Sequence, residues 1–307
     1  MIYRPFGNTG IISSAIGLGT WNIGNQWGEI DSATAYATIH SALDEGVTLI
    51  DTAESYGIPN GLSEERVGQA LTGIRHKAIL VTKIGNWNKG NGGVPLINND
   101  MFRLCCHASL YRLRTDYIDV YLCHLDQLEA DKTDIWLDGL EHLKQRGLIR
   151  CYGISTNSLE VLKRFNKNNT CSAVEVEYSL VDRSAEDGLL DYAHEHGMGV
   201  LVRGPLAKGV LSGQYTRESV FDDNVRANWN NSEGGRRNYS WRMDRLDKIL
   251  QTIPREGLAE TAIRFTASHP AMPVAIPGAK SPEQAAANAR VGDYLFSADE
   301  LRRFKGI

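Results

Sequence analysis

The stretch VTLIDTAESYG at residues 47–57 has the pattern of a buried strand that ends on a charged side chain. Its first four residues suit a strand of a parallel sheet, because such strands are covered on both faces and carry few polar residues. Asp51 stands where the strand would leave the core, and Tyr56 follows on the next loop. A carboxylate at this position needs a partner, and the polar ends of other strands are the candidates.

Similar apolar runs alternate with amphipathic segments along the whole chain. The eight predicted strands are residues 16–19, 48–51, 78–83, 118–123, 151–154, 173–177, 199–203 and 273–276. The predicted helices are residues 33–45, 64–71, 100–113, 135–146, 159–165, 185–196, 258–268 and 282–291. Strand–helix units repeated in this way over 307 residues predict one α/β domain, a (β/α)8 TIM barrel over residues 1–307. A doubly wound sheet is the alternative, but GLGTWNIG after the first strand lacks the GxGxxG spacing.

Residues 215–241 interrupt this alternation after the seventh strand. The segment contains NVRANWNNSEGGRRNYSW, which is rich in asparagine, arginine and glycine. It predicts a long loop at the C-terminal face of the barrel, where long loops usually carry function. Disorder of this segment is the alternative.

The composition indicates a globular protein with a small-molecule partner. Hydrophobic residues make up 42% of the chain, and the formal net charge is −4 without any basic run. Neither nucleic acid nor an anionic membrane would therefore attract it. No apolar run is long enough to span a membrane, and the N-terminus MIYRPFGNTG lacks the apolar core of a signal peptide. We expect a soluble cytoplasmic protein.

The five cysteines show neither a disulfide framework nor a zinc-binding pattern. Their number is odd and no CxxC spacing occurs, which favours reduced thiols in the core. We therefore expect no metal site.

Polar residues at three predicted strand ends would meet at the mouth of a barrel, since the C-terminal strand ends converge there. Asp51 ends the second strand with Tyr56 on its loop, Lys83 ends the third strand, and His124 follows the fourth. Each alone could equally be a helix cap, a solvated cation or a packing residue. Together they form a chemical set, because an ammonium stabilises a nearby phenolate and a carboxylate keeps that ammonium charged and oriented.

This set suits the reduction of a carbonyl group. His124 could donate a hydrogen bond to the carbonyl oxygen while Tyr56 supplies the proton, which leaves the carbon open to a hydride. No side chain can supply hydride, so a nicotinamide cofactor is required.

Further motifs lie at the predicted strand ends. They are YRPFGNTGIISSAIGLGTW at residues 3–21, GIS at 153–155, VEYSL at 176–180 and IPGAKSPEQAAAN at 276–288. With DTAESYG, these motifs make the chain resemble the aldo-keto reductase family over nearly its whole length. The resemblance implies an N-terminal β-hairpin before the barrel and a catalytic tetrad of Asp51, Tyr56, Lys83 and His124. In this tetrad Tyr56 is the general acid in reduction and the general base in oxidation.

The resemblance also implies NADP(H), bound across the barrel mouth without a Rossmann unit. Ser155 would hold the nicotinamide carboxamide, GPLAKGVLSG at residues 204–213 would form a pyrophosphate strap, and Lys280 would bind the 2′-phosphate. Beside Ser155, Thr156 stands where many members have asparagine. Gln284 stands where an arginine often stabilises the 2′-phosphate, so NAD(H) is the alternative. The implied cofactor-binding set is Gly19, Thr20, Trp21, Ser155, Thr156, Glu175, Arg203, Gly204, Leu206, Lys208, Ser212, Gly278, Lys280, Ser281, Gln284 and Asn288.

Two further residues of this set depart from the family pattern. Glu175 replaces a common carboxamide-binding glutamine, and Arg203 stands where many members stack a tyrosine on the nicotinamide. A guanidinium plane can also stack on a ring, and a carboxylate would offset its charge. We therefore predict that Glu175 and Arg203 pair beneath the nicotinamide. Two unrelated strand-end residues are the alternative.

Tryptophans near the predicted mouth suggest an aromatic substrate site. Trp21 leaves the first strand, Trp87 follows the third, and Trp229 and Trp241 lie in the long polar segment with Arg226. Aromatic walls suit the apolar faces of a sugar or a small aldehyde, and the polar neighbours favour a hydroxylated or acidic carbonyl compound. Core packing is the alternative for Trp21. Since the chain ends soon after its last predicted helix, we expect no long C-terminal substrate loop.

Three functions remain open at this point. The favoured one is an NADP-dependent oxidoreductase that interconverts a carbonyl compound, such as a sugar or a small hydroxylated aldehyde or ketone, and its alcohol. The second is a Schiff-base lyase with Lys83 as the nucleophile. The third is a nucleotide-sensing regulatory subunit, because some members of the resembled family serve ion channels as auxiliary proteins.

Overall fold

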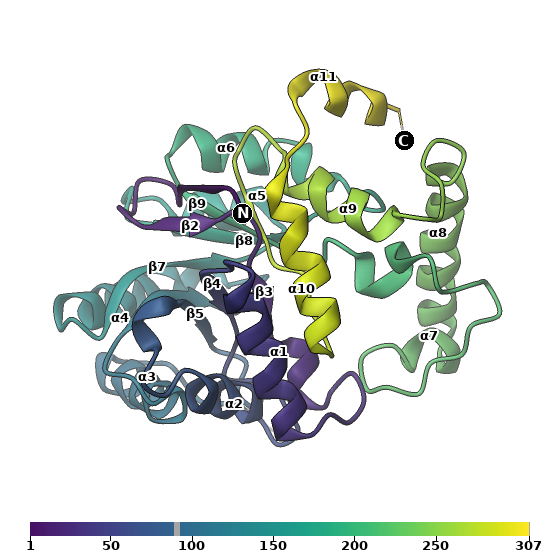
Figure 1. The fold of residues 1–307 in the computed structure, drawn as a ribbon. Helices are drawn as coiled ribbons and strands as arrows, with labels where there is room; N and C mark the ends of the chain where they lie inside the picture. The colour runs from purple at the N-terminus through teal and green to yellow at the C-terminus, as the bar shows by residue number, and fades with distance from the viewer. Residues whose placement is uncertain (89–92, 307) are drawn as a thin grey trace.

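Parallel strands form a curled sheet with helices packed around it (Figure 1), and the computed structural model describes residues 1–88 and 93–306. Eight strands lie in the order β10-β9-β8-β7-β6-β5-β4-β3. They are β3 (Leu18–Gly19), β4 (Leu49–Asp51), β5 (Ile79–Ile84), β6 (Ile118–Cys123), β7 (Ile149–Ser155), β8 (Ala173–Glu177), β9 (Gly199–Arg203) and β10 (Val274–Ala275). Parallel bridges join Ile16 to Ala275 and Gly19 to Gly278, so the curled sheet closes on itself. The predicted (β/α)8 barrel is confirmed.

Helices follow the strands and cover the outside of the sheet. They are α1 (Ser32–Asp44), α2 (Leu62–Ala70), α3 (Asn99–Leu113), α4 (Thr133–Gln145), α5 (Leu159–Phe165), α6 (Leu189–Glu195), α9 (Leu258–Ala267) and α10 (Pro282–Arg290), with a short α11 (Ala298–Leu301) near the C-terminus. Local signals set where they begin: Asn98, Ser158 and Ser281 each accept a hydrogen bond from a backbone N–H in the first turn. The helix predicted at 185–196 is shorter, because Gly188 adopts a left-handed conformation (φ 101°) just before α6.

An antiparallel hairpin precedes the barrel and closes its N-terminal end. It consists of β1 (Tyr3–Pro5) and β2 (Ile12–Ser14). Phe6, in its turn, is 1% exposed and packs among aliphatic side chains of β4, β6 and β9 that fill the barrel interior. A Cβ atom on Gly199, at the start of β9, would lie 2.4 Å from the Phe6 ring. The glycine therefore makes room for this aromatic plug.

The polar segment after β9 is helical over much of its length, so the predicted long loop is wrong from residue 228 onwards. The helices α7 (Asn228–Asn231) and α8 (Glu233–Ile249) stand beside the barrel (Figure 1). Ser232 caps α8 by accepting a hydrogen bond from the N–H of Gly235. The buried stripe of α8 includes Met243, Leu246 and Ile249, which lie beyond the polar stretch. The glycine pair and the density of polar residues concealed this helix.

Two features are absent from the described residues. None of their helices is both long enough and apolar enough to span a bilayer. None of their His, Cys, Asp and Glu side chains form a group of three or more that could hold a metal ion. The five cysteines are buried and unpaired, and burial raises the pKa of Cys106 to about 12, which keeps its thiol protonated.

Candidate active site

A cavity of about 1140 Å³ opens at the C-terminal ends of the barrel strands. It exceeds the roughly 300–1,000 Å³ typical of sites for drug-sized ligands, and so has room for a dinucleotide together with a small substrate. Its lining includes these predicted residues: Gly19, Trp21, Asp51, Tyr56, His124, Ser155, Arg203, Gly204, Leu206, Lys208, Ser212, Arg226, Gly278, Lys280, Gln284 and Asn288. The barrel therefore gathers most of the residues that the sequence suggested.

A buried lysine joins the polar strand ends at the floor of this cavity. Lys83 lies two residues beyond Val81, the partner of Asp51 in the strand register, so both side chains point into the barrel. The Nζ atom of Lys83 donates to Asp51 Oδ1 at 2.5 Å and to the Tyr56 hydroxyl oxygen at 3.3 Å. The ring of His124 stands edge-on to Tyr56, with 5.8 Å between the ring centroids. The predicted tetrad residues are thus brought together.

A second carboxyl group reaches the same ammonium from the opposite part of the barrel. Glu175, on β8, places Oε2 3.1 Å from Lys83 Nζ, and both side chains are 0% exposed. Ser155, its neighbour on β7, donates a hydrogen bond of 3.3 Å to Glu175 Oε1. Lys83 is therefore enclosed by two acidic side chains.

Burial and the two carboxyl groups determine whether Tyr56 and Lys83 carry their protons. Burial raises the pKa of Tyr56 well above its ordinary value, and the charge of Lys83 only partly opposes that effect. Lys83 lowers the pKa of Tyr56 as expected, but burial outweighs the cation, and Asp51 and Glu175 oppose it further. Burial disfavours the charged form of Lys83, but the same two carboxyls outweigh it and raise the pKa of Lys83. At neutral pH Tyr56 is a phenol and Lys83 an ammonium.

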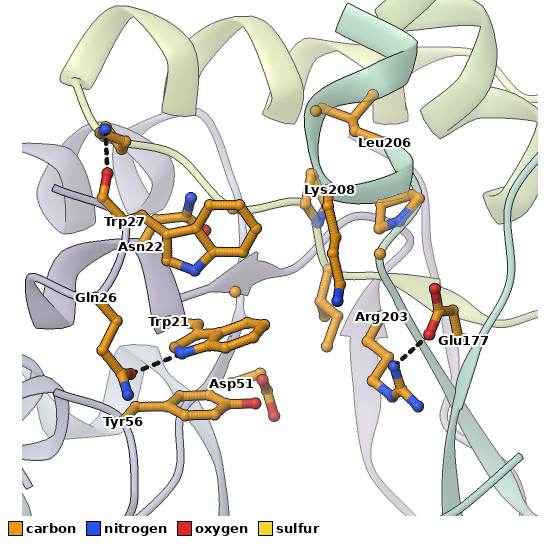
Figure 2. Close-up of a pocket in the computed structure, with 18 of the residues that line it drawn as sticks. Trp21, Asn22, Gln26, Trp27, Asp51, Tyr56, Glu177, Arg203, Leu206 and Lys208 are labelled. Atoms are coloured by element: carbon orange, nitrogen blue, oxygen red, sulfur yellow. Dashed lines mark hydrogen bonds and ion pairs between the residues drawn. The ribbon is translucent and has the colours of Figure 1, made fainter. Parts of the chain in front are cut away.

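Arg203 does not pair with Glu175, which corrects the prediction. Its Nη1 atom lies 2.8 Å from Glu177 Oε2 (Figure 2). The strand register explains the choice, because Glu177 faces Arg203 across β8 and β9 whereas Glu175 faces Leu201. Asn157 also accepts a hydrogen bond from Arg203 at 3.1 Å. The guanidinium is thereby fixed at the cavity wall by groups that the sequence pattern did not indicate.

An aromatic stack forms one wall of the cavity. Trp21 lies between Trp27 and Tyr56 (Figure 2), stacked on Tyr56 with centroids 5.6 Å apart and edge-on to Trp27 at 5.1 Å. Its indole N–H donates to Gln26 Oε1 at 2.6 Å, and the same oxygen accepts from the N–H of Gly57. Trp27 and Gln26 were missed, although both follow Trp21 closely in WNIGNQW.

Three tryptophans predicted to contact substrate lie elsewhere. Trp87 packs against the guanidinium of Arg112, Trp229 stacks on Tyr239 at 5.0 Å in the flank formed by α7 and α8, and Trp241 is exposed on α8. None of the three lines the cavity. The sequence did not show where Trp229 and Trp241 point, because the helices that carry them, α7 and α8, were not foreseen.

The loop after β5 is held by a buried carboxyl group. Glu54 Oε1 accepts hydrogen bonds from the backbone N–H groups of Gly85, Asn86 and Trp87 at 2.6, 3.1 and 3.1 Å. Burial raises the pKa of Glu54 to about 7. Because Asn86 lines the cavity, Glu54 supports part of its rim from beneath.

Cationic and amide groups line the groove between β9 and α10. Lys208 sits in a tight turn with positive φ (58°), and Lys280 Nζ donates to the Trp27 carbonyl at 2.5 Å. Gln284 accepts from the N–H of Lys280, and Asn288 donates to the Gly278 carbonyl. Together with Arg203, these side chains suit a ligand that carries phosphate groups.

Three residues of the predicted cofactor set serve the local structure instead. Thr20 and Thr156 donate their hydroxyls to the backbone carbonyls of Asp51 and Asp126, and Ser281 caps α10. These three side chains do not line the cavity.

The mouth of this parallel barrel holds a buried Lys–Asp pair, a tyrosine hydroxyl and a groove suited to phosphate groups. Together these features define a class of carbonyl and alcohol oxidoreductases. The chain belongs to the Aldo/keto reductase family, whose sequence profile matches residues 15–307. It is accordingly an oxidoreductase that works with a nicotinamide cofactor.

Characterised relatives and solved structures agree with this placement. The chain is 33% identical to aldo-keto reductase YhdN of Bacillus subtilis, covering 100% of this chain and 93% of the relative. It is 35% identical to the NADH-specific methylglyoxal reductase of Escherichia coli over 70% of this chain and 71% of the relative.

Among solved structures, aldo-keto reductase AKR11C1 from Bacillus halodurans superposes with a TM-score of 0.83 at 30% identity, covering 99% and 95% of the two chains. The glycerol dehydrogenase AKR11B4 from Gluconobacter oxydans superposes with a TM-score of 0.77 at 31% identity, covering 96% of this chain and 91% of that one. An aldo-keto reductase from Klebsiella pneumoniae in complex with NADPH superposes with a TM-score of 0.74 at 27% identity, covering 99% of this chain and 94% of that one.

Proposed function

We propose that the protein interconverts a small hydroxylated aldehyde or ketone, or a sugar, and its alcohol, with Tyr56 as the general acid in reduction. The contact of Lys83 Nζ with both Asp51 and the Tyr56 hydroxyl at the cavity floor carries this proposal. A proton donor must lie within hydrogen-bond reach of the substrate oxygen, and Tyr56 is the protonated group that lines the cavity there.

Proton transfer from Tyr56 leaves a phenolate beside Lys83. The ammonium stabilises this phenolate, and Asp51 keeps the ammonium in place. His124, edge-on to Tyr56, is positioned to orient the carbonyl oxygen. In the oxidation of an alcohol the same groups act in reverse, with the phenolate as the base.

The cofactor supplies the hydride, and the groove between β9 and α10 would hold it. Arg203, Lys208 and Lys280 offer positive charge to its phosphates, and Ser155 and Asn288 offer hydrogen bonds. Lys280 favours NADP(H), because an ammonium near the adenosine suits a 2′-phosphate. The relative named as NADH-specific keeps NAD(H) as the alternative.

The substrate side of the cavity combines Trp21 with many carboxamide groups. The loops after β3, β4 and β5 contribute the lining carboxamides Asn22, Gln26, Asn60, Asn86 and Asn88. Carboxamides donate and accept hydrogen bonds, as hydroxylated compounds require, and the indole covers an apolar face. Relatives named for methylglyoxal and glycerol support small oxygenated substrates.

The Schiff-base alternative loses support from the surroundings of Lys83. A nucleophilic amine must be neutral, whereas Lys83 is fully buried between two carboxyl groups that stabilise its charge.

The test is oxidation of NADPH, and separately NADH, by the purified protein with a panel of aldoses, small aldehydes and keto acids. Turnover of hydroxylated carbonyl compounds with NADPH preferred is expected. Binding of NADPH without turnover of any compound would contradict the enzyme proposal and favour the nucleotide-sensing role.

A further inference from the structure

The proposed proton transfer uses one carboxylate beside Lys83, yet the structure provides two. Glu175 is 0% exposed, and its Oε2 atom touches Lys83 Nζ at 3.1 Å from across the barrel. Asp51, 4% exposed, touches the same nitrogen at 2.5 Å. We call Asp51 and Glu175 the carboxyl pair.

The ammonium cannot satisfy both carboxyl groups. Lys83 already donates to Asp51, to the Thr52 carbonyl at 2.9 Å and to the Tyr56 hydroxyl. These acceptors account for its three N–H groups. Glu175 Oε2 is consequently a buried oxygen without a hydrogen-bond donor among the described residues, although it lies within ion-pair distance of Lys83.

The charge balance of Lys83 and the carboxyl pair also favours an added proton. Two ionised carboxylates with one ammonium would leave a net negative charge on almost fully buried side chains, which is costly. Burial, and then the charge of Glu175, raise the pKa of Asp51 well above its ordinary value despite the neighbouring Lys83. One added proton would make the cluster neutral and satisfy the bare oxygen of Glu175.

We propose that the carboxyl pair shares one proton at neutral pH, so that the active site holds a second proton beside Tyr56. The existence of this proton is independent of the proposed function. Its effect on the reaction rests on that function. A glutamine at position 175 would remove it, because a single carboxylate then balances a single ammonium.

Few groups besides the carboxyl pair could titrate next to Glu175. The groups that face it are Asp51 on β4, Tyr56 on the following loop, Lys83 on β5, Ser155 on β7 and Arg203 on β9, with His124 facing Tyr56 from the end of β6. The carboxyls raise the pKa of Lys83, and Glu177, followed by Glu175, raises that of Arg203 against the effect of burial, so both stay charged. Isotope labelling of carboxyl carbons separates the carboxyl pair from His124.

The direct test is carbon NMR of the cofactor-free full chain, labelled with carboxyl-¹³C aspartate and glutamate. Signals are assigned with Glu175→Gln and Asp51→Asn. One proton should leave the pair with a midpoint above pH 7, about three pH units or more above the ordinary carboxyl value. In Glu175→Gln the midpoint of Asp51 should fall. Midpoints below pH 7 for both carboxyls in the unmodified protein would overturn the proposal.

Glu177→Gln is the matched control, because Glu177 lies on the same strand but pairs with Arg203. It should leave the raised midpoint of the pair in place. If it abolished that midpoint, the assignment to Asp51 and Glu175 would be wrong.

A second readout links the pair to the reaction. At alkaline pH, where the pair has released its shared proton, Glu175→Gln carries one negative charge fewer than the unmodified protein. Tyr56 should then release its proton more easily, so the alkaline limb of the reduction profile should move down by about one pH unit. An unmoved limb would overturn the effect on Tyr56. Absence of turnover in the unmodified protein would overturn the proposed function, while NMR still decides the shared proton.

Discussion

The Nζ atom of Lys83 lies 3.3 Å from the hydroxyl oxygen of Tyr56, and 4.9 Å from the centre of its ring. This cation is the group that can stabilise a phenolate at the cavity floor. Because burial and the two neighbouring carboxyls keep Tyr56 protonated, the tyrosine is prepared to donate a proton rather than to accept one.

Tyr56→Phe should abolish carbonyl reduction and leave cofactor binding intact. Removing the hydroxyl deletes the proton donor, whose contribution is expected to be about 10²–10⁴-fold in rate. Stopped-flow or steady-state oxidation of NADPH measures the rate, and fluorescence quenching measures the cofactor Kd. Tyr111→Phe, at a residue 86% exposed, is the control. Loss of cofactor binding in Tyr56→Phe would show a structural role instead.

Lys83→Met should reduce both activity and stability. It leaves the carboxyl pair buried without its cation, and breaking a buried ion pair typically costs about 3–5 kcal/mol. The loss of stability should be smaller at acid pH. Buried carboxyls without a cation have raised pKa values, and once they are protonated no uncompensated charge is buried on folding. Urea unfolding across the acid to neutral range measures this. Equal destabilisation at every pH would contradict it, and the exposed Lys77→Met is the control.

Lys280→Ala should weaken NADPH binding much more than NADH binding. A hydrogen bond to a charged group is worth about 1.5–3 kcal/mol, which corresponds to a factor of roughly ten or more in Kd. Gln284→Arg, which adds a cation one helical turn away, should shift the preference in the opposite direction. Titration of each variant with both cofactors decides. Parallel losses for NADPH and NADH would place Lys280 away from the 2′-phosphate.

Glu54→Gln should remove one source of pH-dependent stability. Burial raises the pKa of Glu54 from 4.5 to about 7, so the folded state holds its proton more tightly than the unfolded state. The resulting stabilisation is complete below the lower value and is lost as pH rises through the higher one. Relative to the variant, the unmodified protein should lose on the order of 3 kcal/mol across this interval. Parallel unfolding curves for the two proteins would refute this assignment.

Much of the fold was predictable because strands and helices repeat with clear periodicities and end at glycine or polar caps. Asp51, Tyr56 and Lys83 were identifiable because barrel topology places the carboxyl ends of strands together. The contact between Glu175 and Lys83 was not, since β8 and β5 are not neighbours and only the barrel interior joins them.

Register errors had a similar origin. The prediction paired Arg203 with Glu175, but strand alignment shifts the partner by two residues to Glu177. Sequence alternation tells which face a residue occupies, and both glutamates occupy the same face of β8. It does not tell which residue of the neighbouring strand lies opposite.

The aromatic plug formed by Phe6 has a consequence for how ligands enter and leave the cavity. Phe6 fills the far end of the barrel, so within the described residues the cavity is closed on that side and opens at the C-terminal ends of the strands. We expect substrate, product and cofactor to share this mouth. Ligands that overlap there have to enter and leave in turn, so we expect a compulsory order of binding and release rather than independent access to two sites.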